Sequence, residues 1–177
     1  FSLDIKLPDP LYEKVIEIDE RILSDGKVIK KLNIQKIRSD LIKAYDEGFK
    51  SLAIIFMHSY KYNQHERSIE KIAQNIGFKQ ISCSHNVSPT IKIINRGDTS
   101  VLDAYISPTI KKYSLNLEKK FRNTKLLFMQ SNGGLSNSKN FKGKNSILSG
   151  PAGGVIGAIL SSQKAGINKI IGFDMGG

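Results

Sequence analysis

The segment SLAIIFMHSY, residues 51–60, decides the fold of this chain. Its residues from Leu52 to Met57 are all apolar, which is typical of a β-strand that other elements cover on both faces. The following NQHERSIEKIAQNIG, residues 63–77, places its isoleucines on one face of an amphipathic helix and ends on Gly77, a suitable helix stop. A second strand-like run, FKQISCSHNV, comes next. Strand, helix and strand in this order predict a parallel β-α-β unit.

The segment before this unit predicts a hairpin followed by a helix. Asp25-Gly26 lies between two β-prone runs, which is a strong hairpin signal. Asn33 is a suitable N-cap, apolar residues recur at helical spacing from Ile34 onward, and Gly48 ends the helix. We therefore assign residues 1–50 to a hairpin and a helix that lead into the core.

The segment after this unit continues the alternation of helices and strands. Residues 99–121 fit one long helix, which Pro108 is expected to kink or interrupt. The region 149–177 contains a helix rich in small residues, predicted over 152–163, and one further strand.

The alternation predicts the fold class as α/β, with a parallel-rich sheet. We assign residues 51–148 to this α/β layer. The four strands of the predicted sheet fall at residues 52–58, 80–84, 125–129 and 169–173.

Composition excludes several classes of protein. The chain has 177 residues, 40% of them hydrophobic, which is enough for about one domain with its own core. No apolar run approaches the roughly 20 residues that cross a bilayer, so we expect no membrane partner and a cytoplasmic location. Cys83 is the only cysteine, which excludes an internal disulfide and a cluster of thiolate ligands. The net charge of +11 comes mainly from scattered lysines, so we expect a basic surface and no nucleic-acid partner.

Polar or glycine-rich residues follow each predicted strand. Ligands of parallel sheets usually bind at the carboxyl ends of the strands, so these positions are candidates for a functional site. They are His58-Ser59-Tyr60, Ser84-His85, Gln130 to Gly134 and Asp174 to Gly177.

The segment MQSNGG, residues 129–134, has two interpretations. Asn132-Gly133 is an excellent turn former, and a turn is a sufficient explanation. Alternatively, the backbone N–H groups of Gly133 and Gly134 bind an anion.

The segment SGPAGGVIGA, residues 149–158, is more unusual. Ser149 is a suitable N-cap with Pro151 near the first helical position. Glycines inside the first turns cost up to about 1 kcal/mol each relative to alanine, so Gly153 and Gly154 need a compensating gain. That gain is close approach, either of another backbone or of a ligand at the helix N-terminus, and both alternatives stay open.

The remaining candidates have simpler interpretations. The three histidines lack the spacing of a helical ligand pair, so we expect no zinc site. His65 is expected to begin an exposed helix, and Arg96 and Asp98 to form a local ion pair or turn in a loop. Cys83 is expected to be a small core residue.

Five segments, in this order, resemble the hydantoinase and 5-oxoprolinase family, which includes acetone carboxylase β-type subunits. The resemblance extends from about residue 8 to residue 177 and is closest to the 5-oxoprolinase branch. The segments are HSYKYNQHE, INRGDTSVLDAYISPTIKKY, FMQSNGGL, ILSGPAGGVIGA and IGFDMGG.

The resemblance implies an incomplete ATPase core of the actin-like, ribonuclease-H-like type. Two phosphate-binding hairpins of the form Asp-x-Gly-Gly-Thr-x-Thr-Asp hold ATP in the family, and the second begins where this chain stops. We therefore expect an internal fragment, truncated after the connecting helix and first strand of the second subdomain, that is inactive in isolation. Its partner would be the rest of the same polypeptide.

The resemblance also implies site residues. Asp174 would be the catalytic residue and the Mg²⁺ ligand, beside Gly176 and Gly177, whose N–H groups would meet the ATP phosphates. SGPAGG would form the connecting helix at the cleft hinge. The other residues expected to contact ATP are Ser131, Asn132, Gly133, Gly134, Gly150, Gly153 and Gly154.

The implied chemistry is ATP-driven opening of a cyclic amide, a small-molecule lactam. The expected reaction converts 5-oxo-L-proline, ATP and water to L-glutamate, ADP and phosphate. The alternatives are an N-methylhydantoinase, an acetone carboxylase β-type subunit, and a shortened non-catalytic relic or interaction module. A homodimer is a further expectation.

Overall fold

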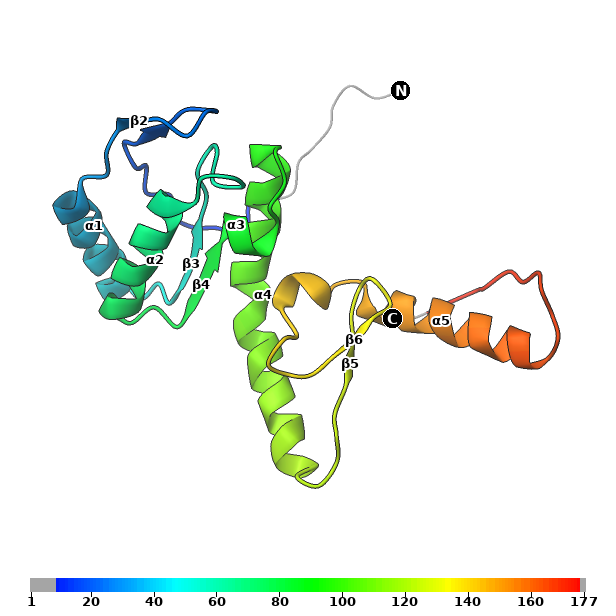
Figure 1. Cartoon of the computed structure of the whole chain (residues 1–177). Coiled ribbons are helices and arrows are strands. Elements are labelled where there is room, and N and C mark those ends of the chain that lie inside the picture. The colour runs from blue at the N-terminus through cyan, green and yellow to red at the C-terminus, as the bar shows by residue number, and fades with distance from the viewer. Residues whose placement is uncertain (1–8, 176–177) are drawn as a thin grey trace. The chain divides into compact units, whose positions relative to one another are not determined.

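The computed structural model describes residues 9–175, which form two compact units (Figure 1). The first unit is Phe1–Tyr105 and the second is Ile106–Gly177. The helix α4, Ile93–Lys120, contributes residues to both. Among the described helices, none has the length and apolar character needed to span a membrane.

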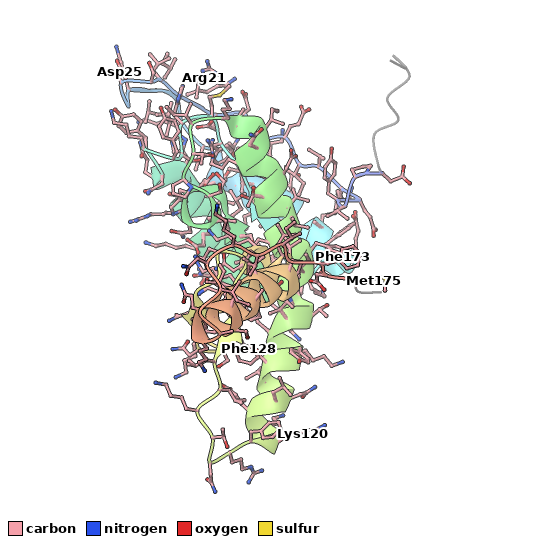
Figure 2. All side chains as sticks on the ribbon, turned by 90° about the vertical axis from the view of Figure 1, so that its right-hand side faces the viewer. Arg21, Asp25, Lys120, Phe128, Phe173 and Met175 are labelled. Carbon is pink, nitrogen blue, oxygen red and sulfur yellow. The ribbon has the colours of Figure 1, made fainter. Side chains whose placement is uncertain are left out.

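The first unit opens with the predicted hairpin and helix. Strands β1, Arg21–Ile22, and β2, Val28–Lys30, pair antiparallel around Asp25-Gly26, and Figure 2 labels Arg21 and Asp25 on this hairpin. The helix α1, Ile34–Asp46, begins after Asn33, whose Oδ1 accepts a hydrogen bond from Lys36 N at 3.0 Å. Both predictions are confirmed.

The predicted β-α-β unit forms the centre of the first unit. Strand β3, Ser51–Ile54, leads through α2, Gln64–Ile76, to strand β4, Gln80–Cys83, which lies parallel to β3. Gly77 ends α2 with φ of 112°, a left-handed conformation that suits glycine. The predicted strand 52–58 is shorter than expected because the chain leaves the sheet after Ile54.

The core of the first unit lies between this sheet and its helices. In Figure 1, α1 and α2 lie on one side of β3 and β4, and the first turns of α4 lie on the other. The buried apolar residues that contact one another there are Ile37, Leu41, Ile54, Ile69, Ala73, Phe78 and Cys83. Cys83 is therefore a core residue, as predicted.

The helix α4 differs from its prediction at both features named in the sequence. It begins at Ile93, so Arg96 and Asp98 lie in a helix and not in a loop. It also continues through Pro108 without the predicted interruption. A proline costs one backbone hydrogen bond and about 3 kcal/mol in a helix interior, and a helix of 28 residues retains the bonds on either side of it. The short helix α3, Ser84–Val87, precedes α4.

The second unit contains a second hairpin and the helix rich in small residues. Strands β5, Phe128–Met129, and β6, Leu135–Ser136, pair antiparallel, and the 3-10 helix η1, Gly143–Asn145, follows. The helix α5, Ser149–Lys164, contains the whole predicted range 152–163. None of its residues is buried.

The predicted parallel-rich sheet is corrected in two places. The predicted strand 125–129 is reduced to β5 and pairs antiparallel in a hairpin, so β3–β4 is the parallel pair among the described residues. The predicted strand 169–173 is wrong, because the segment pairs with no described residue. Ile171 is 97% exposed and Phe173 is 90% exposed, and a strand needs a neighbour to bind its backbone groups. Figure 2 labels Phe173 on this segment. The chain therefore has a mixed α/β fold with small sheets.

Candidate functional site

The carboxyl ends of β3 and β4 carry a group of buried polar side chains, here called the strand-end cluster. All of its members are at most 9% exposed. They are Ser59, Glu66, Ser84, His85 and Arg96. Two of the predicted strand ends, His58-Ser59-Tyr60 and Ser84-His85, thus meet in the structure, as expected for parallel strands.

Glu66 accepts four hydrogen bonds at the centre of this cluster. Its Oε1 lies 3.0 Å from Phe56 N and 2.6 Å from Ser84 Oγ. Its Oε2 lies 3.0 Å from His85 N and 2.6 Å from His85 Nδ1. An ionised carboxylate only accepts hydrogen bonds, so His85 Nδ1 carries a proton. Glu66 has no exposed surface, so these four protein groups take the place of water as hydrogen-bond donors to its carboxylate.

Arg96 supplies the positive charge of the cluster and binds four backbone carbonyls. Its Nη2 donates to Phe56 O and Met57 O, the latter at 2.9 Å, and its Nη1 donates to Thr90 O and Ile91 O. Its Nε donates to Ser84 Oγ at 3.0 Å. Burial lowers the pKa of Arg96, while the charge of Glu66 opposes this shift.

The strand-end cluster holds one negative and one positive charge whose hydrogen-bonding groups are used within the protein. Ser84 Oγ donates to Glu66 and accepts from Arg96, so it links the two charges. Buried charged groups whose donors and acceptors all have hydrogen-bond partners hold those partners in one geometry. The cluster therefore positions the loop that follows β3.

The ligand atoms of Glu66, Cys83 and His85 lie within 4.8 Å of one another, which raises the question of a metal. Burial raises the pKa of the Cys83 thiol, and the nearby carboxylates of Glu70 and Glu66 raise it further. A metal ligand has to be the thiolate, and Glu66 already accepts four hydrogen bonds. The arrangement fits a hydrogen-bond network, because the acceptor positions of Glu66 are already used.

A second group of candidates meets in the second unit, here called the glycine cluster. It joins the turn between β5 and β6, the N-terminal half of α5, and Asp174. A methyl group placed on Gly133 would lie 3.4 Å from Ile156, and one placed on Gly153 would lie 3.7 Å from Met129. A methyl group on Gly154 would lie 3.4 Å from Asp174 Oδ2. Three predicted site segments, far apart in the sequence, therefore lie together.

The turn between β5 and β6 uses its own backbone groups. Gly133, with φ of 80°, donates from its N–H to Gln130 O at 2.9 Å. Gly134 N donates to Asn132 Oδ1, also at 2.9 Å. The turn interpretation of MQSNGG is confirmed, and both N–H groups donate within the turn. Anion binding by these two groups would require them to leave those acceptors, and it stays a prediction.

Ser131 connects this turn to the start of α5. Its Oγ donates to Asn145 O at 2.8 Å and accepts from Leu148 N at 3.0 Å. Leu148 is the N-cap residue of α5, so the prediction that Ser149 caps this helix is wrong. Ser149 Oγ instead donates backward to Ser146 O at 2.7 Å.

The remaining predicted site residues lie apart or beyond the described range. Apart from its chain neighbours and the backbone of its own helix, no described atom lies within 4 Å of a methyl group placed on Gly150. Gly176 and Gly177 lie outside the described residues.

Sequence reasoning missed Glu66 and Arg96 of the strand-end cluster, and it gave the wrong environment for His65, which precedes Glu66 in α2. Arg96 was assigned to a local ion pair, and His65 to an exposed helix start. His65 is 8% exposed, and its Nδ1 lies 2.6 Å from Glu20 Oε2. The sequence offered two signals for this cluster. One is the His65-Glu66 pair after the apolar strand, and the other is Arg96.

Comparison with known proteins identifies the chain. The family model described as hydantoinase/oxoprolinase matches residues 96–177, and the model described as hydantoinase/oxoprolinase N-terminal region matches residues 1–77. The chain belongs to the hydantoinase/oxoprolinase family.

Individual relatives agree with this assignment. The 5-oxoprolinase of Saccharomyces cerevisiae is 41% identical over all of this chain, which covers 16% of the yeast protein. The crystal structure of ATP-dependent caprolactamase from Pseudomonas jessenii has a TM-score of 0.82 and 26% identity, over 100% of this chain and 28% of that one. Nucleotide-free acetone carboxylase has a TM-score of 0.74 and 25% identity, over 84% of this chain and 22% of that one. The chain therefore spans about a sixth of the yeast relative's length.

The segments that carried the resemblance build both clusters. HSYKYNQHE contributes Ser59 and Glu66 to the strand-end cluster, and INRGDTS contributes Arg96. FMQSNGGL, ILSGPAGGVIGA and IGFDMGG contribute to the glycine cluster.

Proposed function

We propose that this chain is part of an ATP-dependent hydrolase of cyclic amides, most closely a 5-oxoprolinase. The proposed reaction opens 5-oxo-L-proline with water and couples this step to hydrolysis of ATP, giving L-glutamate, ADP and phosphate. A lactam is a poor electrophile. Transfer of the terminal phosphoryl group to its carbonyl oxygen would convert that oxygen into a leaving group. Catalysis of such a transfer consists mainly of positioning and charge neutralisation.

The observation that carries this proposal is the 41% identity to yeast 5-oxoprolinase along the whole chain. The caprolactamase, whose structure resembles this chain, is also described as ATP-dependent. Its name refers to another cyclic amide, which supports a lactam as the class of substrate.

The glycine cluster supplies groups suited to magnesium and ATP. Asp174 presents an exposed carboxylate, and Mg²⁺ prefers one or two carboxylates together with phosphate and water oxygens. Gly154 has no side chain, which leaves space beside Asp174 Oδ2. Asp174 would hold the ion, and bound Mg²⁺ would neutralise charge on the phosphates. Gly176, Gly177 and the segments 131–134 and 150–154 would contact ATP, although the N–H groups of Gly133 and Gly134 donate within their own turn.

The actin-like ATPase core, the cytoplasmic location and a role in glutathione metabolism belong to this proposal. So do a homodimer and a contact with the rest of the same polypeptide. The acetone carboxylase alternative is less favoured, because that match covers less of this chain at lower identity.

The test is an assay of the full-length protein that carries this segment. We expect ADP release to depend on 5-oxoproline and Mg²⁺, with one glutamate formed for each ADP. ATP hydrolysis that does not respond to 5-oxoproline or to other lactams would contradict the proposal. The 177-residue chain alone is expected to show no turnover, because it spans about a sixth of its yeast relative.

The role of Asp174 is tested by Asp174→Asn in the full-length protein. We expect loss of lactam-dependent ATP hydrolysis with the fold retained, because the change removes a charge at nearly constant volume. Asp98→Asn is the matched control, since Asp98 is an exposed aspartate on α4. If Asp174→Asn were as active as the control, the Asp174 carboxylate would have no role in catalysis, and Asp174 would be only a turn residue.

A further inference from the structure

The imidazole ring of His85 uses one of its two nitrogens within the strand-end cluster. Its Nδ1 donates a hydrogen bond to Glu66 Oε2 at 2.6 Å, and within residues 9–175 the ring binds Glu66 alone. A hydrogen bond at one ring nitrogen fixes the tautomer of a histidine. In the neutral ring, Nε2 therefore carries a lone pair and is an acceptor.

The Nε2 atom of His85 reaches the surface of the first unit, although the ring is almost buried. The side chain of His85 is 5% exposed. Among the described residues, the fully buried side-chain nitrogen and oxygen atoms that lack a hydrogen-bond partner are His58 Nδ1 and Ser136 Oγ. Since Nε2 of His85 has no protein partner and is not one of them, this acceptor is accessible to a small ligand.

His85 lies where parallel sheets usually bind their ligands. It follows β4 directly, at the carboxyl end of the strand. His58, in the loop after β3, has a buried Nδ1 without a partner, and the centre of its ring lies 6.3 Å from that of Tyr60. The Tyr60 ring in turn lies 5.7 Å from the guanidinium carbon of Arg96. This edge of the sheet therefore carries two imidazole nitrogens that no described residue binds.

We propose that Nε2 of His85 accepts a hydrogen bond from the ring N–H of the lactam substrate. This inference rests on the proposed function and adds a specificity-determining residue to it. A lactam has one N–H donor on its amide, and a histidine with a fixed tautomer is a matching acceptor. Glu66 keeps the ring in this orientation, because four donors hold its own carboxylate. Sites that bind a substrate N–H reject analogues that lack it.

Two matched ligands test this assignment in the full-length protein. They are 5-oxo-L-proline and its lactone analogue, in which a ring oxygen replaces the N–H with little change of shape. We expect the Kd of the lactone to be at least about 10-fold higher, because it cannot donate to Nε2. Calorimetry with a non-hydrolysable ATP analogue present gives both Kd values without turnover. Equal Kd values would overturn the proposal.

The variant His85→Asn separates recognition of the lactam from stability. The asparagine amide places an NH₂ donor near the position of Nδ1, so the bond to Glu66 is kept, but it has no atom at the position of Nε2. We expect a Tm close to that of the wild type, a Kd for 5-oxoproline about 10-fold higher, and loss of the preference over the lactone. A folded variant that retains this preference would overturn the proposal and leave the proposed function standing.

The matched control is His65→Asn. The Nδ1 of His65 lies 2.6 Å from Glu20 Oε2, so this histidine makes the same kind of pair with a carboxylate. We expect both Kd values to stay at their wild-type levels in the control. If His85→Asn does not fold, the comparison of the two ligands in the wild type decides alone. A wild-type protein that binds neither ligand would overturn the proposed function, and this inference with it.

Discussion

Glu66 accepts two hydrogen bonds from a single residue, His85, although 19 positions separate them in the sequence. The backbone N of His85 lies 3.0 Å from Glu66 Oε2, and its ring Nδ1 lies 2.6 Å from the same atom. This pair fastens helix α2 to the carboxyl end of strand β4. Loss of this pair should therefore lower the stability of the first unit, which is a structural effect and not a catalytic one.

The change Glu66→Gln should destabilise the chain by about 3 kcal/mol. Glutamine replaces one acceptor oxygen by an NH₂ group, which would face hydrogen-bond donors in a buried site. The urea midpoint of unfolding measures this change. Glu17→Gln, on an exposed residue, is the control and should change stability by less than about 0.5 kcal/mol. Equal midpoints for the two variants would show that the cluster does not hold the fold together.

The change Arg96→Lys should destabilise the chain by about 2 kcal/mol, although it keeps the charge. A lysine has three donors on one atom and cannot reach the carbonyls of Phe56 and Ile91 together with Ser84. Thermal unfolding of this variant is compared with that of Arg38→Lys, at an exposed arginine on α1. A Tm for Arg96→Lys no lower than that of the control would contradict the assigned role.

The Cys83 thiol should be unreactive in the folded chain. Burial and two neighbouring carboxylates raise its pKa, so the thiolate that reacts with iodoacetamide is not formed. We expect labelling at pH 8 only after denaturant is added. Rapid labelling of the native chain would contradict the burial.

The same pKa shift predicts a loss of stability at high pH. The unfolded thiol ionises near pH 8.5 while the folded thiol stays protonated, so this contribution is complete below that pH and decreases as the pH rises. The free energy of unfolding should therefore fall more between pH 8 and pH 10 in the wild type than in Cys83→Ala, which lacks the group. If the free energy of unfolding fell equally with pH in the two proteins, the Cys83 thiol would not cause the loss of stability.

Gly154 distinguishes an open helix face from a packed one. In the 177-residue chain an added methyl group would make only an ordinary contact with Asp174, so Gly154→Ala should stabilise α5 by up to about 1 kcal/mol. In the full-length protein we expect Gly154→Leu to destabilise by about 1 to 3 kcal/mol through overpacking at the predicted cleft hinge. Denaturant midpoints for both proteins give the signs. Stabilisation by leucine in the full-length protein would mean that this face is exposed to solvent.

The elements that the sequence predicted correctly have local causes. The side chain of Asn33 caps α1 from three residues away, and Gly77 ends α2 through its own φ angle. The periodicity of isoleucines in 63–77 likewise depends on the helix alone. Such signals involve residues that are only a few positions apart in the chain, so they can be recognised in a single sequence.

The predictions that failed concern partners far away in the chain. Arg96 was assigned to a loop because its carbonyl partners, Phe56 and Met57, lie 40 and 39 residues earlier. The strand predicted at 169–173 has the right residues but no neighbour among the described residues. The proximity of Gly154 to Asp174 was not predicted: the family resemblance implies a role at the ATP site for each, and neither residue type by itself indicates the other.

The contacts of Arg96 also make the packing of one element depend on another. A guanidinium group becomes buried at a tolerable cost only when carbonyls are already in place to receive it. Two of those carbonyls belong to the loop after β3, and Nε binds Ser84 at the end of β4. Docking of the start of α4 therefore gains these hydrogen bonds only where the β3-α2-β4 unit is in place, since Phe56 lies 40 residues before Arg96. The arginine thus makes the docking of a late helix conditional on a completed sheet.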